Sequence, residues 1–294
     1  MAWGNLVSAT GSGLACPDWP LCRGTVTPPA RPEVILEWGH RLLAAGASVL
    51  ILSCVILTWR HSKTNPYLKR LFRSLLTGLF ILLIAQVLLG GLTVMLKLSI
   101  LASTIHLVNA NIIFAGLLLL ACVSTWGAST QSVDSPKLKR LAVTGMGALL
   151  IQLLLGALVR HGHAGLACPN FPGCLDRFLP IPLTPQTLVA FVHRWWGVLL
   201  LGVFVHIRLA ASRQAPSLSR LAGLLMSLSV FQVVLGIYTV RQGLDTHLRA
   251  THAAVGYGLW ALLCTIAFRS GAFRSLWTPR ESTAGLAARP VAGE

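Results

Sequence analysis

The sequence predicts an all-α polytopic membrane protein that consists of two tandem, pseudo-symmetric four-helix bundles. Three observations predict this fold: an apolar composition, a series of long apolar segments, and an internal duplication. Hydrophobic residues make up 54% of the 294 residues, charged residues make up 11%, and the mean hydropathy is +0.71. Because soluble globular domains carry about 25% charged residues, this composition indicates a chain that lies largely within a membrane.

Seven apolar segments are long enough to be transmembrane helices. A spanning helix needs about 20 mostly apolar residues, and uncharged stretches such as 74–96 and 221–240 meet this requirement. The seven predicted spans are residues 35–60, 72–96, 99–126, 138–160, 187–211, 219–240 and 247–268. From Arg269 onward the chain is rich in Arg, Ala, Gly and Pro, which is typical of a disordered tail.

The net charge of +16 is concentrated in short segments between these spans. In a soluble protein such a charge would indicate nucleic acid binding, whereas basic clusters beside apolar segments indicate cytoplasmic loops. The basic segments 60–73, 137–140 and 208–220 and the tail are therefore expected in the cytoplasm. The alternate loops 7–34, 96–99, 161–186 and 241–247 are then expected outside.

The two halves of the chain are copies of each other in the same orientation. Residues 4–22 align without a gap on residues 156–174, and both stretches contain Gly-Leu-Ala-Cys-Pro. Further similarities pair 39–46 with 192–199, 86–94 with 232–240, and 103–110 with 250–256. The duplication predicts an N-terminal half-bundle at 1–130, a C-terminal bundle at 138–268 and the tail at 269–294.

The first copy contains three of the predicted spans, whereas the second contains four. Alignment with residues 151–159 places the missing first helix of the N-terminal copy ahead of Gly4. Either Met1 is not the natural start of the protein or the helix has been lost, and we favour the first explanation. The chain as given is thus expected to contain seven transmembrane helices.

Four of the nine histidines occupy equivalent places in the two copies. His40 and His106 in the first copy, like His193 and His252 in the second, lie near the outer ends of predicted helices. A single histidine at such a place is usually a hydrogen-bonded side chain. Two repeat-related pairs at one depth instead suit axial ligation of a haem within a four-helix bundle. Zinc is disfavoured, because no third or fourth ligand accompanies either pair.

Arginines at the outer helix ends are candidates for binding haem propionates, because the guanidinium group suits carboxylate recognition. Arg41 and Arg194 each directly follow a histidine of a pair, which favours this role for them. The alternative interpretation is that arginines at these ends anchor the helices at the membrane interface. The other arginines at the outer ends are Arg160, Arg241 and Arg249.

Glu37 distinguishes the first copy from the second. It precedes His40 by three residues and therefore shares its helix face, whereas its counterpart lies near Ala190. An ionisable group close to the apolar layer indicates a function, although the helix dipole also favours an acid in a first turn. The asymmetry predicts that only the N-terminal bundle carries an acid beside its histidine pair.

Four of the seven cysteines lie in the two longer outer loops, where an oxidising environment would allow disulfides to persist. These are Cys16, Cys22, Cys168 and Cys174. The other three cysteines, Cys54, Cys122 and Cys264, lie within apolar segments and are expected to be inert.

The stretches TGSGLACPDWPLC and EWGHRLLA resemble the haem A synthase family, in the subgroup with a cysteine pair in the outer loops. The similarity covers both Cys loops, the four histidines and the matching Gln-containing helices, which is essentially the whole chain. The resemblance implies an oxidoreductase that oxidises the C8 methyl of haem O to the formyl group of haem A for terminal oxidases. It also implies eight membrane helices, so this chain departs from the family pattern by one helix.

The resemblance further implies a role for individual residues. His193 and His252 would hold a haem b cofactor, whereas His40 and His106 would bound the substrate site. Glu37 would be the catalytic acid of that site. The pairs Cys16–Cys22 and Cys168–Cys174 would be disulfides, the first with a part in redox chemistry or haem delivery. Expected partners are haem O, haem O synthase, oxidase assembly factors and the lipid membrane, with no nucleic acid.

Two other functions are compatible with the sequence. The first is a bis-His dihaem cytochrome that transfers electrons, and the second is a haem transporter or chaperone. Glu37 argues against the cytochrome, because an electron carrier needs no acid in one half only. In the enzyme, two hydroxylations would give a gem-diol that loses water to an aldehyde, with Glu37 moving protons. The sequence shows no two-His-one-carboxylate iron motif.

Overall fold

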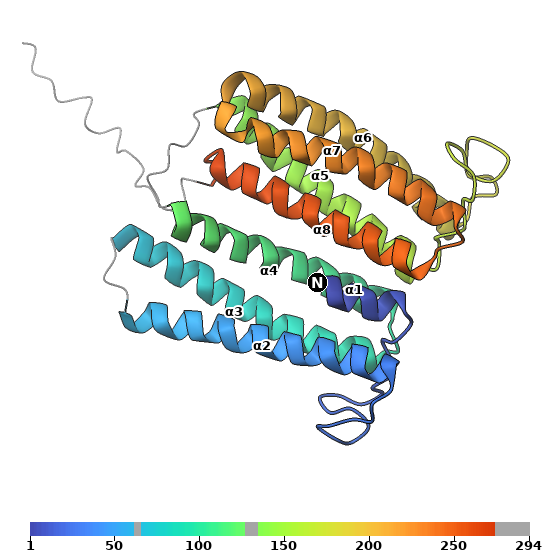
Figure 1. Ribbon diagram of the computed structural model, residues 1–294, viewed down its shortest axis with the longest axis horizontal. Coiled ribbons are helices and arrows are strands. Elements are labelled where there is room, and N and C mark those ends of the chain that lie inside the picture. The colour runs from blue at the N-terminus through green and yellow to red at the C-terminus, as the bar shows by residue number, and fades with distance from the viewer. Residues whose placement is uncertain (62–65, 127–134, 274–294) are drawn as a thin grey trace, which may run out of the picture.

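Helices make up nearly all of the secondary structure in the computed structural model, which describes residues 1–61, 66–126 and 135–273 (Figure 1). The helices are α1 (Ala2–Ala9), α2 (Pro32–His61), α3 (Pro66–Met95), α4 (Ile100–Trp126), α5 (Pro136–His161), α6 (Pro185–Gln214), α7 (Pro216–Arg241) and α8 (Thr246–Arg269). Within these residues, seven helices, α2 to α8, are long and apolar enough to cross a membrane. The predicted all-α fold with seven spans is confirmed.

Six of the seven spans begin one to six residues earlier than the apolar pattern alone predicted, and α4 begins one residue later. Most of the early starts arise because the first turn is marked by proline rather than by apolar residues. Proline suits the first turn of a helix, since its φ angle is already helical and its missing N–H would have no partner there. Five spans begin in this way, at Pro32, Pro66, Pro136, Pro185 and Pro216. The N-terminus of α8 is instead capped by Asp245, whose carboxylate accepts the N–H groups of His247 and Leu248.

The long helices lie side by side, and both long loops that carry cysteines lie at the same end of the molecule (Figure 1). Helices α5, α6, α7 and α8 pack in a closed ring, since α5 contacts both α6 and α8. Helices α2, α3 and α4 pack in sequence order, and α4 also contacts α5 and α8. We refer to residues 10–31 and 162–184 as the first and second Cys loops, and to their side of the molecule as the Cys-loop end.

The largest buried cluster lies where α4 to α8 meet. Phe204, Ile207 and Leu263 are at most 1% exposed, and they pack beside the small residues Ala211 and Ala222, which have no exposed surface. Lipid tails are as apolar as these side chains, so close packing rather than escape from water holds the helices together. Small residues allow that close approach. A hydrogen bond of 3.1 Å from the Trp260 indole to the Asn111 carbonyl also ties α8 to α4.

The short helix α1 is the repeat counterpart of the last two turns of α5. The alignment offset of 152 residues maps Ala2–Ala9 onto residues 154–161. Helix α1 packs on α2 and on α8, so it lies between the two halves of the chain at the Cys-loop end. At the other end of the sequence, Phe273 follows α8 and packs edge to face against Phe268 of that helix, and the rest of the predicted tail lies outside the described residues.

Candidate functional site

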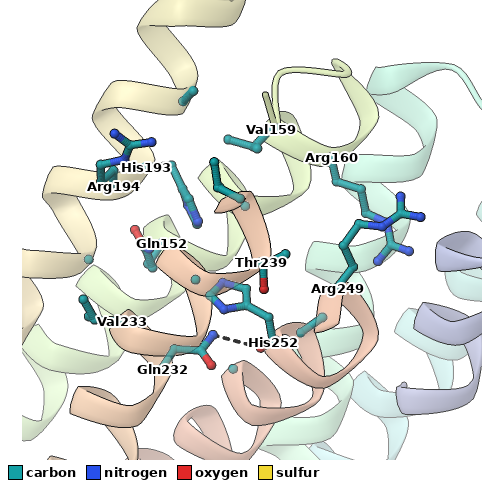
Figure 2. Close-up of a pocket in the computed structure, with 18 of the residues that line it drawn as sticks. Gln152, Val159, Arg160, His193, Arg194, Gln232, Val233, Thr239, Arg249 and His252 are labelled. Carbon is teal, nitrogen blue, oxygen red and sulfur yellow. Dashed lines mark hydrogen bonds between the residues drawn. The ribbon is translucent and has the colours of Figure 1, made fainter. Parts of the chain in front are cut away.

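Helices α5 to α8 enclose a cavity of about 440 Å³ towards the Cys-loop end. His193 from α6 and His252 from α8 line this cavity and point into it from different helices (Figure 2). The Nδ1 atoms of both histidines are buried and have no hydrogen-bond partner within the described part of the chain. A buried polar atom without a partner is costly, so these imidazoles are suited to a ligand. Gln152 and Gln232 also line the cavity, and their Oε1 atoms are likewise without partners among the described residues.

Each of the four repeat-related histidines packs against a glycine on a neighbouring helix. A Cβ atom at Gly156 would lie 3.1 Å from Cε1 of His193, and one at Gly236 would lie 3.0 Å from Cε1 of His252. The same arrangement occurs in the first copy, where the corresponding distances are 2.8 Å for Gly4 with His40 and 3.3 Å for Gly90 with His106. These distances are shorter than ordinary van der Waals contacts, so each imidazole lies in a space that a larger residue would close.

The N-terminal histidine pair carries a polar chain that the C-terminal pair lacks. Asn109 donates to the Gln86 side-chain oxygen at 2.8 Å and to the Leu82 carbonyl at 2.9 Å. The Gln86 amide nitrogen then lies 3.2 Å from Nε2 of His106, so the amide group orients the imidazole. In the second copy Gln232 donates to the backbone carbonyl of His252 instead, and valine replaces Asn109 at position 255.

Sequence reasoning missed this polar chain. Gln86 is the first residue of the stretch 86–94, which repeats at 232–240. That repetition was the sequence signal that could have pointed to Gln86. No sequence signal pointed to Asn109, since its repeat counterpart is apolar.

Both predicted disulfides, Cys16–Cys22 and Cys168–Cys174, are present, with Cα–Cα distances of 4.6 and 4.3 Å. An arginine fastens each loop to the helix that follows it. Arg41 donates to the carbonyls of Cys16, Asp18 and Leu21. Arg194 donates to the carbonyls of Cys168, Asn170 and Gly173, which are the same three positions 152 residues later. The duplication therefore extends to individual hydrogen bonds.

This arrangement gives Arg41 and Arg194 a task other than the predicted propionate contact. Their guanidinium nitrogens donate hydrogen bonds to carbonyls of the loops, and these carbonyls compete with any carboxylate for the same donors. Arg194 still borders the cavity, but Arg160 and Arg249 also line it and project from α5 and α8 (Figure 2). Arg241 is the remaining arginine of the lining.

Glu37 is buried, with 4% of its surface exposed, and is bonded to the first Cys loop. Its Oε2 atom accepts the N–H of Cys16 at 2.7 Å, and its Oε1 atom pairs with Arg41 at 2.7 Å. The carboxylate is thus fixed between a disulfide cysteine and a loop-anchoring arginine, one helical turn before His40. Ala190 stands at the equivalent place in α6, so the second copy has no such link.

The two histidine pairs are joined through α1. Asn5 of α1 donates to the carbonyl of Ala250 in α8 at 2.9 Å, and Arg160 donates to the carbonyl of Asn5 at 2.9 Å. Arg249 donates to the carbonyl of Ala9 at 2.8 Å. The same two arginines line the C-terminal cavity, so α1 connects that cavity to the glycine that packs on His40.

Asp18 stabilises the first Cys loop in a pH-dependent way. Hydrogen bonds from the backbone N–H of Gly24 and of Arg23 lower the pKa of its carboxyl below the ordinary 3.8. Because the folded-state pKa is the lower one, these bonds contribute fully above the unfolded pKa and are lost as the pH falls through the folded pKa. We expect exchange protection of the Arg23 and Gly24 amides, corrected for intrinsic rates, to fall from about pH 5 towards about pH 2.

Hydrogen–deuterium exchange with mass spectrometry of this loop checks the prediction. Asp18→Asn introduces the residue found at the repeat position, Asn170, and should show a protection that no longer changes over this pH range. If exchange protection in the unaltered protein did not change with pH, this would contradict the role given to the Asp18 carboxylate.

Known proteins resemble this chain over most of its length. Residues 30–264 match the COX15-CtaA family, which is described as cytochrome oxidase assembly protein. A protein of Bacillus licheniformis named "Heme A synthase" is 31% identical over 269 residues, which is 89% of this chain and 88% of the relative. Proteins of the same name from Bacillus cereus (strain AH187) and Bacillus mycoides are 30% and 31% identical, and each match covers 89% of this chain and 85% of the relative.

Proposed function

We propose a division of labour between the two halves of this chain, which belongs to the COX15-CtaA family and is a haem A synthase. It is a multi-pass membrane protein and an oxidoreductase whose substrate is haem O. In the proposal, the C-terminal half holds a haem b cofactor and the N-terminal half binds the haem O substrate. The observation that carries this assignment is the asymmetry at Glu37, because a buried carboxylate accompanies the N-terminal histidine pair and alanine stands at the equivalent place beside the C-terminal pair.

The residues around the C-terminal cavity fit a haem. His193 and His252 would hold the haem iron, since both line the cavity and each has a buried nitrogen with no hydrogen-bond partner among the described residues. Most of the lining is apolar, and its four arginines would give the cavity the positive charge that suits propionates: Arg160, Arg194, Arg241 and Arg249. Bound haem b would supply one-electron transfer at this site. The glycines at 156 and 236 leave the space that the imidazoles occupy.

The N-terminal half has the groups that a substrate site needs beyond a histidine pair. His40 and His106 would hold haem O, and the amide of Gln86, itself held by Asn109, fixes the orientation of His106. Conversion of a methyl to a formyl group adds one oxygen atom and removes two hydrogen atoms from the carbon, so protons are transferred at the reacting carbon. Glu37 is the buried carboxylate next to this pair, so it is placed to accept those protons. Its bonds to Cys16 and Arg41 keep it in position.

The proposed topology places the Cys loops outside the cytoplasm and the C-terminus inside it. Disulfides persist in oxidising compartments, and basic residues such as Lys139, Arg140 and Arg213 lie towards the opposite end of the helices. A cysteine introduced at the exposed Gln242 should react with a membrane-impermeant maleimide in intact cells. A cysteine at the exposed Arg213 should react only after lysis, and the opposite pattern would refute this orientation.

The enzymatic function is tested by extracting total haem from membranes that contain this chain together with a source of haem O. Chromatography should show haem A, with or without its hydroxylated precursor. Unmodified haem b as the sole product would instead identify an electron carrier or a haem chaperone.

A further inference from the structure

The two Cys loops present different aromatic residues to the helices below them. Trp19 in the first loop and Phe171 in the second occupy repeat-related positions, 152 residues apart. Phe171 lines the C-terminal cavity together with His193, and its ring centre lies 5.6 Å from Cζ of Arg194. By the same repeat relation, Trp19 is the aromatic residue that the first loop presents to the N-terminal histidine pair.

Trp19 packs directly on the backbone of α3, beside the glycine that accommodates His106. A Cβ atom at Gly91 would lie 2.9 to 3.2 Å from three atoms of the Trp19 indole, so the indole depends on glycine at this position. The preceding residue, Gly90, is the one against which His106 packs. In the second copy the counterpart of Gly91 is Ile237, whose side chain would occupy the space that the indole fills in the first.

The loop around Trp19 is fastened on both sides. The disulfide joins Cys16 to Cys22, and Arg41 donates to the carbonyls of Asp18 and Leu21, which flank the Trp19–Pro20 pair. Trp19 as a whole residue nevertheless remains 40% exposed. Trp19 therefore combines a fixed position with a free aromatic surface, next to one of the two proposed ligands of the substrate.

We propose that Trp19 is a positioning residue that forms one wall of the haem O site, and that Gly91 allows it to do so. The inference rests on the proposed function, because it assumes that haem O binds between His40 and His106. A porphyrin is a flat aromatic surface, and an indole ring provides a large, rigid contact for such a surface. The pairing of Trp19 with Gly91 then distinguishes the substrate site from the cofactor site, which has Phe171 and Ile237.

A double-mutant cycle tests this coupling in the purified protein with its haem b in place. Trp19→Ala should raise the Kd and the KM for haem O about three- to tenfold, which is the range for one aromatic contact, and should change kcat little. Gly91→Ile should produce a similar loss by displacing the indole. Since both changes remove the same contact, the double variant should be no weaker than either single variant. Haem b content should be normal in all three, and this shows that they fold.

Two further variants accompany the cycle, one as a partial rescue and one as a control. Trp19→Phe, which installs the residue of the second copy, should recover part of the affinity. Trp59→Ala removes an exposed tryptophan whose ring packs on Arg73 instead, and should leave the Kd for haem O unchanged. An unchanged Kd in Trp19→Ala, or additive effects of Trp19→Ala and Gly91→Ile, would overturn the inference.

Failure of this inference can be distinguished from failure of the proposed function. The His40→Ala/His106→Ala variant should lose haem O binding. If it does so while the Trp19 variants bind normally, only the role of Trp19 is wrong. If it retains full affinity for haem O, the N-terminal substrate site is wrong as well.

Discussion

Glu37→Gln is expected to lower haem A output by about 10²- to 10⁴-fold, the range typical of losing a general acid or base. Glutamine keeps the shape of the side chain and can still accept the Cys16 N–H, so the first Cys loop should remain in place. Arg41 also retains its three carbonyl partners in the loop. The variant therefore removes the titratable proton with little change in structure, and haem b should stay near its normal level.

Extraction of total haem followed by chromatography measures both quantities in one sample. Glu33→Gln is a matched control, because Glu33 is an exposed acid in the first turn of the same helix and should not affect conversion. Full conversion by Glu37→Gln, or loss of its haem b, would contradict the assignment of the reactive site to the N-terminal half.

His193→Ala or His252→Ala is expected to remove most of the bound haem b. Each histidine would supply one nitrogen ligand to the iron, and each imidazole lies in the space that a glycine on the next helix leaves open. The pyridine haemochrome spectrum of the purified variants quantifies the loss. His206→Ala is the control on the same helix as His193, because His206 is exposed and its Nδ1 atom is bonded to the Gly202 carbonyl. A dispensable His193 together with an essential His206 would refute the ligand assignment.

The features that the sequence predicted well are those that can be recognised from the linear order of residues alone. Span length follows from the run of apolar residues, and the Cys loops and histidine pairs are visible because the chain repeats them. The helix starts were misplaced by a few residues because proline, as at Pro136 and Pro216, begins a helix ahead of its apolar segment. Duplication was therefore the most informative signal, since it distinguished four histidines from the other five.

The features that the sequence did not predict depend on which helices approach one another. The Gly4 contact with His40 joins α1 to α2, and the Asn109–Gln86 bond joins α4 to α3. Neither contact leaves a spacing pattern, because the partners lie on separate helices. The task of Arg41 could not be predicted for a related reason. Its position beside a histidine indicated a haem contact, whereas folding of the Cys loop brings three carbonyls to the guanidinium group.

Binding of haem O to two matched variants tests directly whether haem O binds in the N-terminal half. Haem O is titrated into purified His40→Ala/His106→Ala and His193→Ala/His252→Ala proteins, and the Soret difference spectrum reports the bound fraction. We expect the first variant to lose high-affinity binding of haem O and keep haem b, whereas the second should lose haem b and still bind haem O. Retention of haem O binding by the first variant and its loss in the second would contradict the account.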